Sequence, residues 1–228
     1  MLSLEQIKFL RGEFSLTANW SIEAGARVAV VGPSGGGKST LLSLISGFDV
    51  PASGAVKWKD KNLGGVLPGE RPIAMIFQDN NLFPHLDIET NVALGRDPAA
   101  RPSAGARDEA RTALASVGLE GMGTRYPSEL SGGQQGRAAL ARVLLTHKPL
   151  VLLDEPFAAL GPALRVEMLD LVNTILPDAT IIMVSHDPND AKHWATHVVF
   201  VDDGIASPPL PTAEFFQNPS PAVQNYLA

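Results

Sequence analysis

The chain has 228 residues, of which 45% are hydrophobic and 18% charged, as is typical of a globular protein with a sizeable core. Its formal net charge of −6 argues against non-specific nucleic-acid binding, which needs a basic surface. It has no cysteine, which excludes disulfides and thiolate metal sites, and no apolar run of about 18 residues that would span a bilayer, so we expect any membrane association to go through a partner.

The first 31 residues favour β-structure. Residues 2–9 alternate loosely between apolar and polar and predict an edge strand, and Trp20–Ile22 continues an antiparallel pair before a turn at Gly25. Arg27–Val31 is a short β-branched run, which is typical of a buried strand.

A glycine-rich loop follows that strand and fits the phosphate-binding pattern G-x-x-x-x-G-K-[ST]. Its residues are Gly32, Pro33, Ser34, Gly35, Gly36, Gly37, Lys38, Ser39 and Thr40. Glycines let the backbone curl so that successive N–H groups point at one anion, and the helix expected over 41–46 adds its positive N-terminal end. Lys38 would then reach the β- and γ-phosphates, and the Ser39 hydroxyl would bind Mg²⁺. A chance turn is the alternative, but strand, loop and helix are all in place.

Two more strands lead to the next candidate residue. Ala55–Trp58 predicts a strand with Asp60–Asn62 as its turn, and Ile73–Phe77 is an apolar run that ends at Gln78. A polar residue at the tip of a buried strand is a common place for a site residue in α/β proteins, so Gln78 is a candidate.

The character of the chain changes between Asp79 and about Leu130. Short helical patterns over Ile88–Leu94 and Ala106–Val117 are separated by prolines and glycines, which predicts a helical insertion in an α/β core. The charged residues at 107–109 and 111 are interpreted as a solvated helix face.

A second glycine-containing motif, Leu130–Arg137, opens a helix expected to run to about Leu145. Ser131 and Gln134 have the spacing of a capping box. That spacing does not explain Gly132 and Gly133 in the first turn, where each glycine lowers helix stability by about 1 kcal/mol. Two glycines there indicate that something must approach the backbone closely.

Two carboxylates end the next apolar run. Leu150–Leu153 predicts a buried strand, and Asp154 and Glu155 follow it. Because Mg²⁺ beside a phosphate loop needs a carboxylate ligand, this strand end is a candidate metal site.

The remaining elements complete the α/β pattern. A helix from Pro162 is expected to turn four residues toward the core, Val166, Leu169, Val172 and Leu176. A buried strand over Thr180–Val184 leads to an N-cap at Asp187. Val198–Val201 and Gly204–Ala206 predict a closing hairpin, and Ser207–Pro211 an extended linker to one short terminal helix.

Taken in order, these motifs resemble those of the ATP-binding-cassette (ABC) ATPases. The match covers nearly the whole chain and includes Gly32–Thr40, Gln78, Leu130–Gln134, Leu150–Pro156 and His186. The resemblance implies an α/β fold, with a P-loop NTPase (RecA-like) core that has a mixed sheet, an N-terminal antiparallel β portion and an inserted α-helical subdomain. It implies one ABC ATPase domain over 1–228, with 1–81 and 146–228 as the core and 82–145 as the helical subdomain.

The resemblance also implies a head-to-tail homodimer that sandwiches two ATP molecules. Each ATP would contact Gly32–Thr40 of one subunit and the motif of the other subunit, which comprises Ser131, Gly132, Gly133 and Gln134. Mg²⁺ would be held by Ser39, Asp154 and Gln78. Three residues would be catalytic, with Glu155 as general base, Gln78 sensing Mg²⁺ and the attacking water, and His186 contacting the γ-phosphate.

Within the family, the chain looks like the ATP-binding subunits of bacterial thiamine importers, because of Phe77–Leu86, Gly47-Phe48 and its length. This implies uptake of thiamine or its phosphates through integral membrane permease subunits, at the cytoplasmic face of the inner membrane, with a periplasmic solute-binding protein as an indirect partner and no nucleic acid. The alternatives are an importer for a polyamine, iron, sulfate or sugar, a soluble ABC-type ATPase, and a P-loop kinase, which would explain neither Ser131–Gln134 nor Glu155.

Two positions depart from the family pattern, and two questions stay open. Gly161 stands where the family usually has Asp, which puts the coupling of the two nucleotide sites in doubt, and Gly136 stands where Gln is common. The residue that stacks on adenine is one of three candidates, Phe9, Arg11 and Phe14. Three apolar residues after Gln78 are either contacts for the membrane subunit or core residues, and these are Leu82, Phe83 and Leu86.

Overall fold

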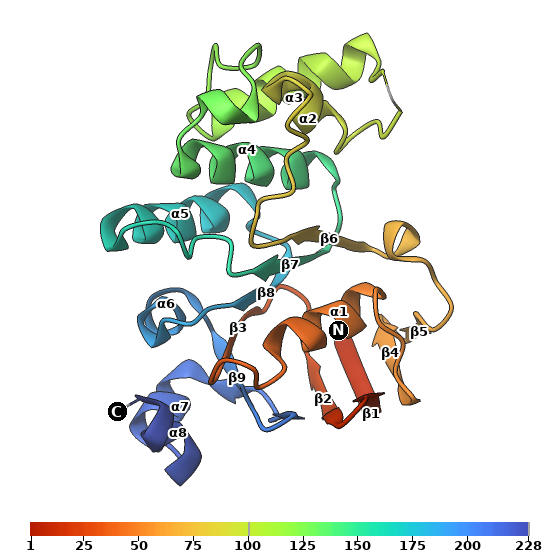
Figure 1. Ribbon diagram of the computed structural model, residues 1–228, viewed down its shortest axis with the longest axis vertical. Helices are drawn as coiled ribbons and strands as arrows, with labels where there is room; N and C mark the ends of the chain where they lie inside the picture. The colour runs from red at the N-terminus through yellow and green to blue at the C-terminus, as the bar shows by residue number, and fades with distance from the viewer. Residues whose placement is uncertain (100, 228) are drawn as a thin grey trace. The chain divides into compact units, whose positions relative to one another are not determined.

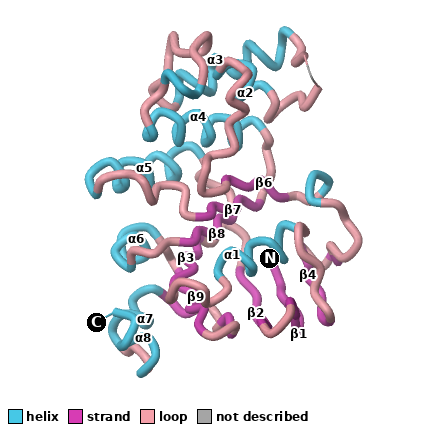
Figure 2. The backbone as a smooth tube through the Cα atoms, in the orientation of Figure 1, coloured by secondary structure: helices cyan, strands magenta, loops and turns pink. Residues whose placement is uncertain are grey.

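The computed structural model describes residues 1–99 and 101–227. They form two compact units. The first comprises Met1–Ile73, Leu150–Asp154 and the chain from Ala179 onward, and the second comprises Ala74–Pro149 and Glu155–Asp178. Strands dominate the first unit and helices the second (Figure 2). These units have bounds of their own, so the division into a core and a helical subdomain at 82–145 stays a prediction.

The strands of the first unit form a mixed sheet in the order β5-β4-β1-β2-β10-β9-β3-β8-β7, with β11 added to β9. They are β1 (Leu2–Arg11), β2 (Phe14–Ile22), β3 (Arg27–Val31), β4 (Ser53–Trp58), β5 (Lys61–Asn62), β7 (Leu150–Asp154), β8 (Thr180–Val184), β9 (His197–Asp202), β10 (Ile205–Ala206) and β11 (Leu210–Pro211). Strands β9, β3, β8 and β7 are parallel, whereas β2, β1, β4 and β5 are antiparallel. The predicted mixed sheet with an N-terminal antiparallel portion is therefore confirmed.

The parallel part of the sheet forms the core of this unit. Val28–Val31 and Leu150–Leu153 are fully buried, because helices cover a parallel sheet and its strands become continuous apolar runs. Helix α1 (Lys38–Ser46) packs on β7, α6 (Pro188–Trp194) on β3, and α7 (Thr212–Gln217) on β9 (Figure 1).

A buried arginine holds the C-terminal end of α1. Arg71 is 5% exposed and follows the short 3₁₀ helix Pro68–Glu70. Its guanidinium group donates to four backbone carbonyls, those of Leu44, Ile45, Leu63 and Val66. Burial lowers the pKa of Arg71, although an arginine so placed keeps its charge. The guanidinium group leaves room only for glycine at position 47, where a Cβ atom would lie 2.4 Å from it.

Two predictions in the N-terminal sheet were wrong. β1 is internal, since it pairs with β2 on one side and β4 on the other. Alternation of apolar and polar residues shows only that one face of a strand is buried. Internal and edge strands of an antiparallel sheet both have this pattern, so it cannot tell them apart. Lys61 and Asn62 are not a turn but form β5, while the turn falls at Lys59 and Asp60, which both have positive φ.

The second unit begins within β6 (Ile73–Ile76) and contains the predicted helical insertion. Its helices are α2 (Ile88–Ala93), α3 (Ala104–Ser116), α4 (Gly132–Leu145) and α5 (Pro162–Ile175), with a 3₁₀ helix over Pro127–Glu129. α2, α3 and α4 enclose an apolar core that includes Val92, Leu114 and Leu119. Side chains of Asp87, Ser103 and Ser131 cap these three helices, because each accepts a hydrogen bond from a first-turn N–H group.

Helix α5 packs on α4 with a face slightly different from the one predicted. Met168, Leu169 and Val172 are buried, and Leu176 just beyond the helix is 8% exposed. Val166, predicted to face the core, is 41% exposed. At about 100° per residue, Val166 lies roughly 60° beyond the edge of the stripe that the four buried residues define.

The C-terminal tail differs from the predicted linker and single helix. Leu210 and Pro211 form β11 against β9, and two short helices follow, α7 and α8 (Pro221–Leu227). Phe215 of α7 and Val223 of α8 are buried in a cluster with Phe200. A two-residue ladder and two short helices leave too little periodicity to be seen in sequence.

Across residues 1–99 and 101–227, no helix has the length and apolar character that crossing a membrane requires.

Candidate functional site

The phosphate-type loop lies between β3 and α1, and its glycines are needed for a reason that the motif alone does not reveal. A Cβ atom at Gly32 would lie 2.0 Å from the carbonyl oxygen of Val201, and one at Gly36 would lie 2.8 Å from the same atom. The loop is therefore pressed against β9, and Gly204 N–H donates to the Gly36 carbonyl at 3.2 Å. Sequence reasoning missed Val201, because nothing marks a backbone carbonyl 169 residues away from Gly32.

Lys38 is positioned by the loop itself. It is 8% exposed, and its ammonium group donates to the carbonyls of Gly32 and Pro33, both at 2.8 Å. The ammonium group therefore lies against the loop at the N-terminus of the nine-residue helix α1, whose first N–H groups carry partial positive charge. A lysine and a helix N-terminus at one loop favour a phosphate group.

Two of the three predicted ligands of Mg²⁺, Ser39 and Asp154, are in contact. Ser39 Oγ donates to Asp154 Oδ1 at 3.2 Å, although 115 residues separate them. Packing of α1 on β7 brings them together. Neighbouring oxygens around Mg²⁺ lie about 3 Å apart at its usual bond lengths, so this pair fits the ion. Among the described residues no group of three His, Cys, Asp or Glu side chains is placed to hold a metal.

Glu155 directly follows Asp154 and has an unusual backbone conformation. It is partly buried and has φ of 46°, in the left-handed region that residues other than glycine rarely adopt. Such conformations cost about 1–3 kcal/mol and occur mostly at functional sites. Glu155 belongs to the second unit and Asp154 to the first.

His186 lies just beyond the buried strand β8 and is exposed. Its carbonyl accepts from the Tyr226 hydroxyl of α8 at 3.4 Å. The next residue, Asp187, caps α6 as predicted, and Ser185 Oγ donates to Asp190 at 2.5 Å. The strand end that carries His186 is thus tied to two helices of the first unit.

Gln78 lies in a tight turn of the second unit, two residues after β6, and is exposed. The N–H group of Phe77 donates to Asn81 Oδ1 at 3.0 Å and that of Asn80 to the Phe77 carbonyl at 2.9 Å. Asn80 and Asn81 both have positive φ, 62° and 52°.

The motif at the start of α4 forms the predicted capping box. The Ser131 hydroxyl accepts from Gln134 N at 3.4 Å, and the Gln134 side chain accepts from Ser131 N at 3.0 Å. Gly133 faces α5, where a Cβ atom would lie 2.8 Å from the end of the Leu164 side chain. Gly132 is exposed and meets only Leu160 at 3.8 Å. A side chain at Gly133 would require Leu164 to move, and the role predicted for both glycines in a close approach stays a prediction.

The two departures from the family pattern differ in surroundings. Gly136 is buried, and a Cβ atom added there would lie 3.4 Å from the end of the Met168 side chain. Glutamine would therefore fit at this position only if Met168 moved. Gly161 is the N-cap of α5, has ordinary φ of −65° and has open space around its Cβ position. A side chain would fit at Gly161, so its absence is not imposed by packing.

The structure distinguishes the three adenine candidates. Phe9 is 6% exposed, and the Arg11 guanidinium lies over its ring at 5.1 Å and pairs with Asp49. Phe14 lies beside the phosphate-type loop, with its ring 3.0 Å from the Cβ position of Gly37. Phe14 is therefore the candidate in contact with the loop.

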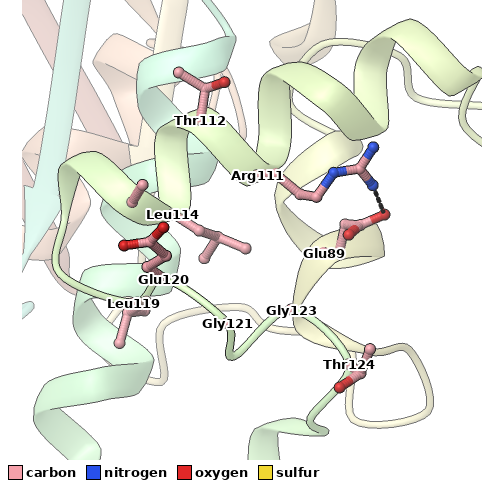
Figure 3. A pocket seen from close by; sticks show the side chains of 10 residues that line it. Glu89, Arg111, Thr112, Leu114, Leu119, Glu120, Gly121, Gly123 and Thr124 are labelled. Atoms are coloured by element: carbon pink, nitrogen blue, oxygen red, sulfur yellow. Dashed lines mark hydrogen bonds and ion pairs between the residues drawn. The ribbon is translucent and has the colours of Figure 1, made fainter.

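A pocket of about 530 Å³ opens in the second unit between α2, α3 and the loop after α3 (Figure 3). It is lined by Glu89, Arg111, Thr112, Leu114, Ala115, Leu119, Glu120, Gly121, Gly123 and Thr124. Leu114 and Leu119 are almost fully buried, and Arg111 donates to Glu89 at 2.9 Å, which raises the pKa of Arg111. The pocket thus combines an apolar floor with a charged rim.

Of the three apolar residues after Gln78, Leu82 packs on the helical core and Phe83 is 45% exposed.

Comparison with known proteins gives a consistent result. Residues 16–158 match the model of the family described as ABC transporter. The chain is 53% identical to the thiamine import ATP-binding protein ThiQ of Cereibacter sphaeroides and 51% identical to that of a Ruegeria species, covering 100% of this chain and 99% of each relative. It is also similar to two dimeric structures of the ABC transporter cassette MJ0796. Both are 29% identical and cover 93% of this chain and 99% of theirs, with TM-scores of 0.79 for the post-hydrolysis state bound to ADP and phosphate and 0.80 for the other.

Proposed function

The chain belongs to the ABC transporter family, and on that premise we propose that it is the ATP-hydrolysing subunit of a bacterial thiamine importer. The contact between Ser39 and Asp154, together with the Lys38 ammonium group held at the phosphate loop, carries the ATPase part of this proposal. Full-length identity of 51–53% to two thiamine import ATP-binding proteins supports the solute.

The residues act on ATP mainly by positioning and by stabilising charge. The N–H groups of Gly32–Thr40 and the Lys38 ammonium group bind the phosphates, and Phe14 stacks on adenine. Ser39 and Asp154 hold Mg²⁺, with Gln78 as a further ligand. When bound, Mg²⁺ neutralises charge on the β- and γ-phosphate oxygens.

Glu155 and His186 serve the chemical step. The Glu155 carboxylate accepts a proton from the attacking water, and Gln78 orients that water. His186 donates to a γ-phosphate oxygen, where negative charge gathers during transfer.

A second copy of the chain completes each nucleotide site. The Ser131 hydroxyl and the exposed N–H of Gly132 contact the γ-phosphate bound by the partner, with Gly133 and Gln134 shaping the turn. Hydrogen bonds to charged groups contribute about 1.5–3 kcal/mol each, so a few of them make dimer closure depend on the γ-phosphate. Dimeric structures of a cassette with 29% identity support this assembly.

The pocket of Figure 3 is the proposed docking site for a short helix of the permease. Its apolar floor suits one apolar side chain, and its charged rim suits polar flanks. Docking there places the chain at the cytoplasmic face of the inner membrane, with a periplasmic solute-binding protein as the indirect partner.

Filling that pocket is expected to uncouple the chain from its permease. Ala115→Arg adds a long side chain at an exposed lining position of α3, so permease binding should fall at least tenfold, while ATP hydrolysis by the isolated chain stays within twofold. Pull-down with the co-expressed permease measures the first effect. Ala104→Arg, at an exposed position of the same helix outside the pocket, is the control. Normal permease binding by Ala115→Arg would contradict the docking site.

The solute is tested with the complete importer. In proteoliposomes that contain the permease and this chain, ATP hydrolysis should rise at least fivefold when thiamine and its binding protein are added. Polyamine, iron, sulfate and sugar, each offered with the same binding protein, should give no rise. Stimulation by one of those solutes instead would overturn the assignment to thiamine.

A further inference from the structure

Arg142 of α4 binds the turn that carries Gln78, and both lie in the second unit. Its guanidinium group donates to the carbonyl of Asn81 at 2.7 Å and to that of Asn80 at 3.1 Å. Burial lowers the pKa of Arg142, and the nearby Asp79 carboxylate opposes that shift. A charged group is thus partly removed from water to bind two backbone carbonyls, which is the fork geometry that arginine provides and lysine does not.

The turn that carries Gln78 depends on Arg142, which lies outside the turn. Within it, the Asn81 side chain accepts from Phe77 N, and Asp79 accepts from Asn81 N at 3.2 Å. These bonds use the N–H groups of the turn. The carbonyls of Asn80 and Asn81, two consecutive residues with positive φ, are bound by Arg142. The strained conformation is therefore held from α4.

The backbone of α4 at Arg142 is also held in place. A Cβ atom at Gly95 would lie 2.2 Å from the Arg142 carbonyl oxygen, so the chain after α2 presses against α4 at this residue. The same helix begins at Gly132, about 15 Å away at 1.5 Å per residue. One rigid helix thus has the Ser131 cap at its start and the Gln78 turn attached near its end.

We propose that Arg142 is a positioning residue that fixes the Gln78 turn to the helix carrying Ser131–Gly133. Gln78 then moves together with the residues that meet the γ-phosphate of the partner's nucleotide. The consequence for the reaction rests on the proposed function, because it uses the role given there to Gln78. The attachment of the turn does not rest on it and is measured separately.

Arg142→Lys is the sharpest test, because lysine keeps the charge but cannot bind both carbonyls in one plane. Hydrogen exchange of the segment 77–82, measured without nucleotide, should speed up at least tenfold. Arg137→Lys is the matched control, since Arg137 lies on the same helix and binds the Val117 carbonyl and Glu167 instead. It should leave exchange at 77–82 unchanged. Unchanged exchange in Arg142→Lys would overturn the proposal, whatever the protein does with ATP.

The second readout is enzymatic. Arg142→Lys should lower kcat about tenfold and raise the Mg²⁺ concentration for half-maximal activity, while ATP affinity without Mg²⁺ stays within twofold. In a Gln78→Ala background the same substitution should change kcat less than twofold, since residues that act through one another are not additive. A full tenfold loss in that background would show that Arg142 does not act through Gln78. Failure of the proposed function itself would appear as a lack of hydrolysis in the unmodified protein, with the exchange result intact.

Discussion

Glu155→Gln is expected to lower ATP hydrolysis by about 100-fold or more, because glutamine has the shape of glutamate but accepts no proton from water. ATP affinity should stay within about twofold, since the phosphate loop and Lys38 lie elsewhere in the chain. With hydrolysis blocked, the ATP-bound dimer should accumulate. Phosphate release, ATP titration and light scattering after size-exclusion chromatography measure the three effects.

Two variants make this result specific. Glu167→Gln, which removes a carboxylate that pairs with Arg137 in the same unit, should leave hydrolysis unchanged. Adding Ser131→Arg to Glu155→Gln should keep the protein monomeric, because a long side chain at the start of α4 blocks the partner's γ-phosphate. A Glu155→Gln protein that hydrolyses ATP normally as a monomer would refute the role of general base.

Arg71→Met is expected to lower the free energy of unfolding by at least about 3 kcal/mol. Methionine fills much of the volume but donates to none of the four carbonyls that Arg71 binds. The Leu63 carbonyl keeps its bond from Val66 N–H, and each other buried acceptor left without a partner costs about 1–3 kcal/mol. For a chain of this length such a loss lowers Tm by roughly 6–12 °C. Calorimetry or thermal unfolding followed by circular dichroism measures it.

The matched control is Arg11→Met in the same unit. The Arg11 side chain is 63% exposed and pairs with Asp49, and exposed ion pairs contribute less than about 1 kcal/mol. Its Tm should therefore fall by no more than roughly 4 °C. Equal stability of Arg71→Met and the unmodified protein would mean that water replaces the hydrogen bonds from Arg71.

Local patterns in the sequence were sufficient for most helices and strands. The buried strands before Gly32 and Ser185 were confirmed, because a short apolar run rich in β-branched residues is typical of a buried strand. The caps at Ser131 and Asp187 were also confirmed, since capping depends on residues within one turn. The contact between Ser39 and Asp154 agrees with the predicted metal ligands, whose role stays a proposal.

What the sequence could not reveal depends on contacts between distant backbone groups. Val201 sets the need for glycine at two loop positions through its carbonyl oxygen, and any residue has that atom. Arg71 and Arg142 look like ordinary surface arginines until their partners, again carbonyls, are known. The internal position of β1 depends on β4, which follows it by about 40 residues.

The phosphate loop is held in shape by protein contacts, through Val201, Gly204 and the bonds from Lys38 to its own loop. A receptor that is ordered in advance loses little chain entropy when it captures its ligand, and capture is not slowed by refolding. Nucleotide binding to an open, single subunit should then show one kinetic phase, without a slow step of loop refolding. The slow step of the transport cycle would then be the association or dissociation of the two copies of the chain.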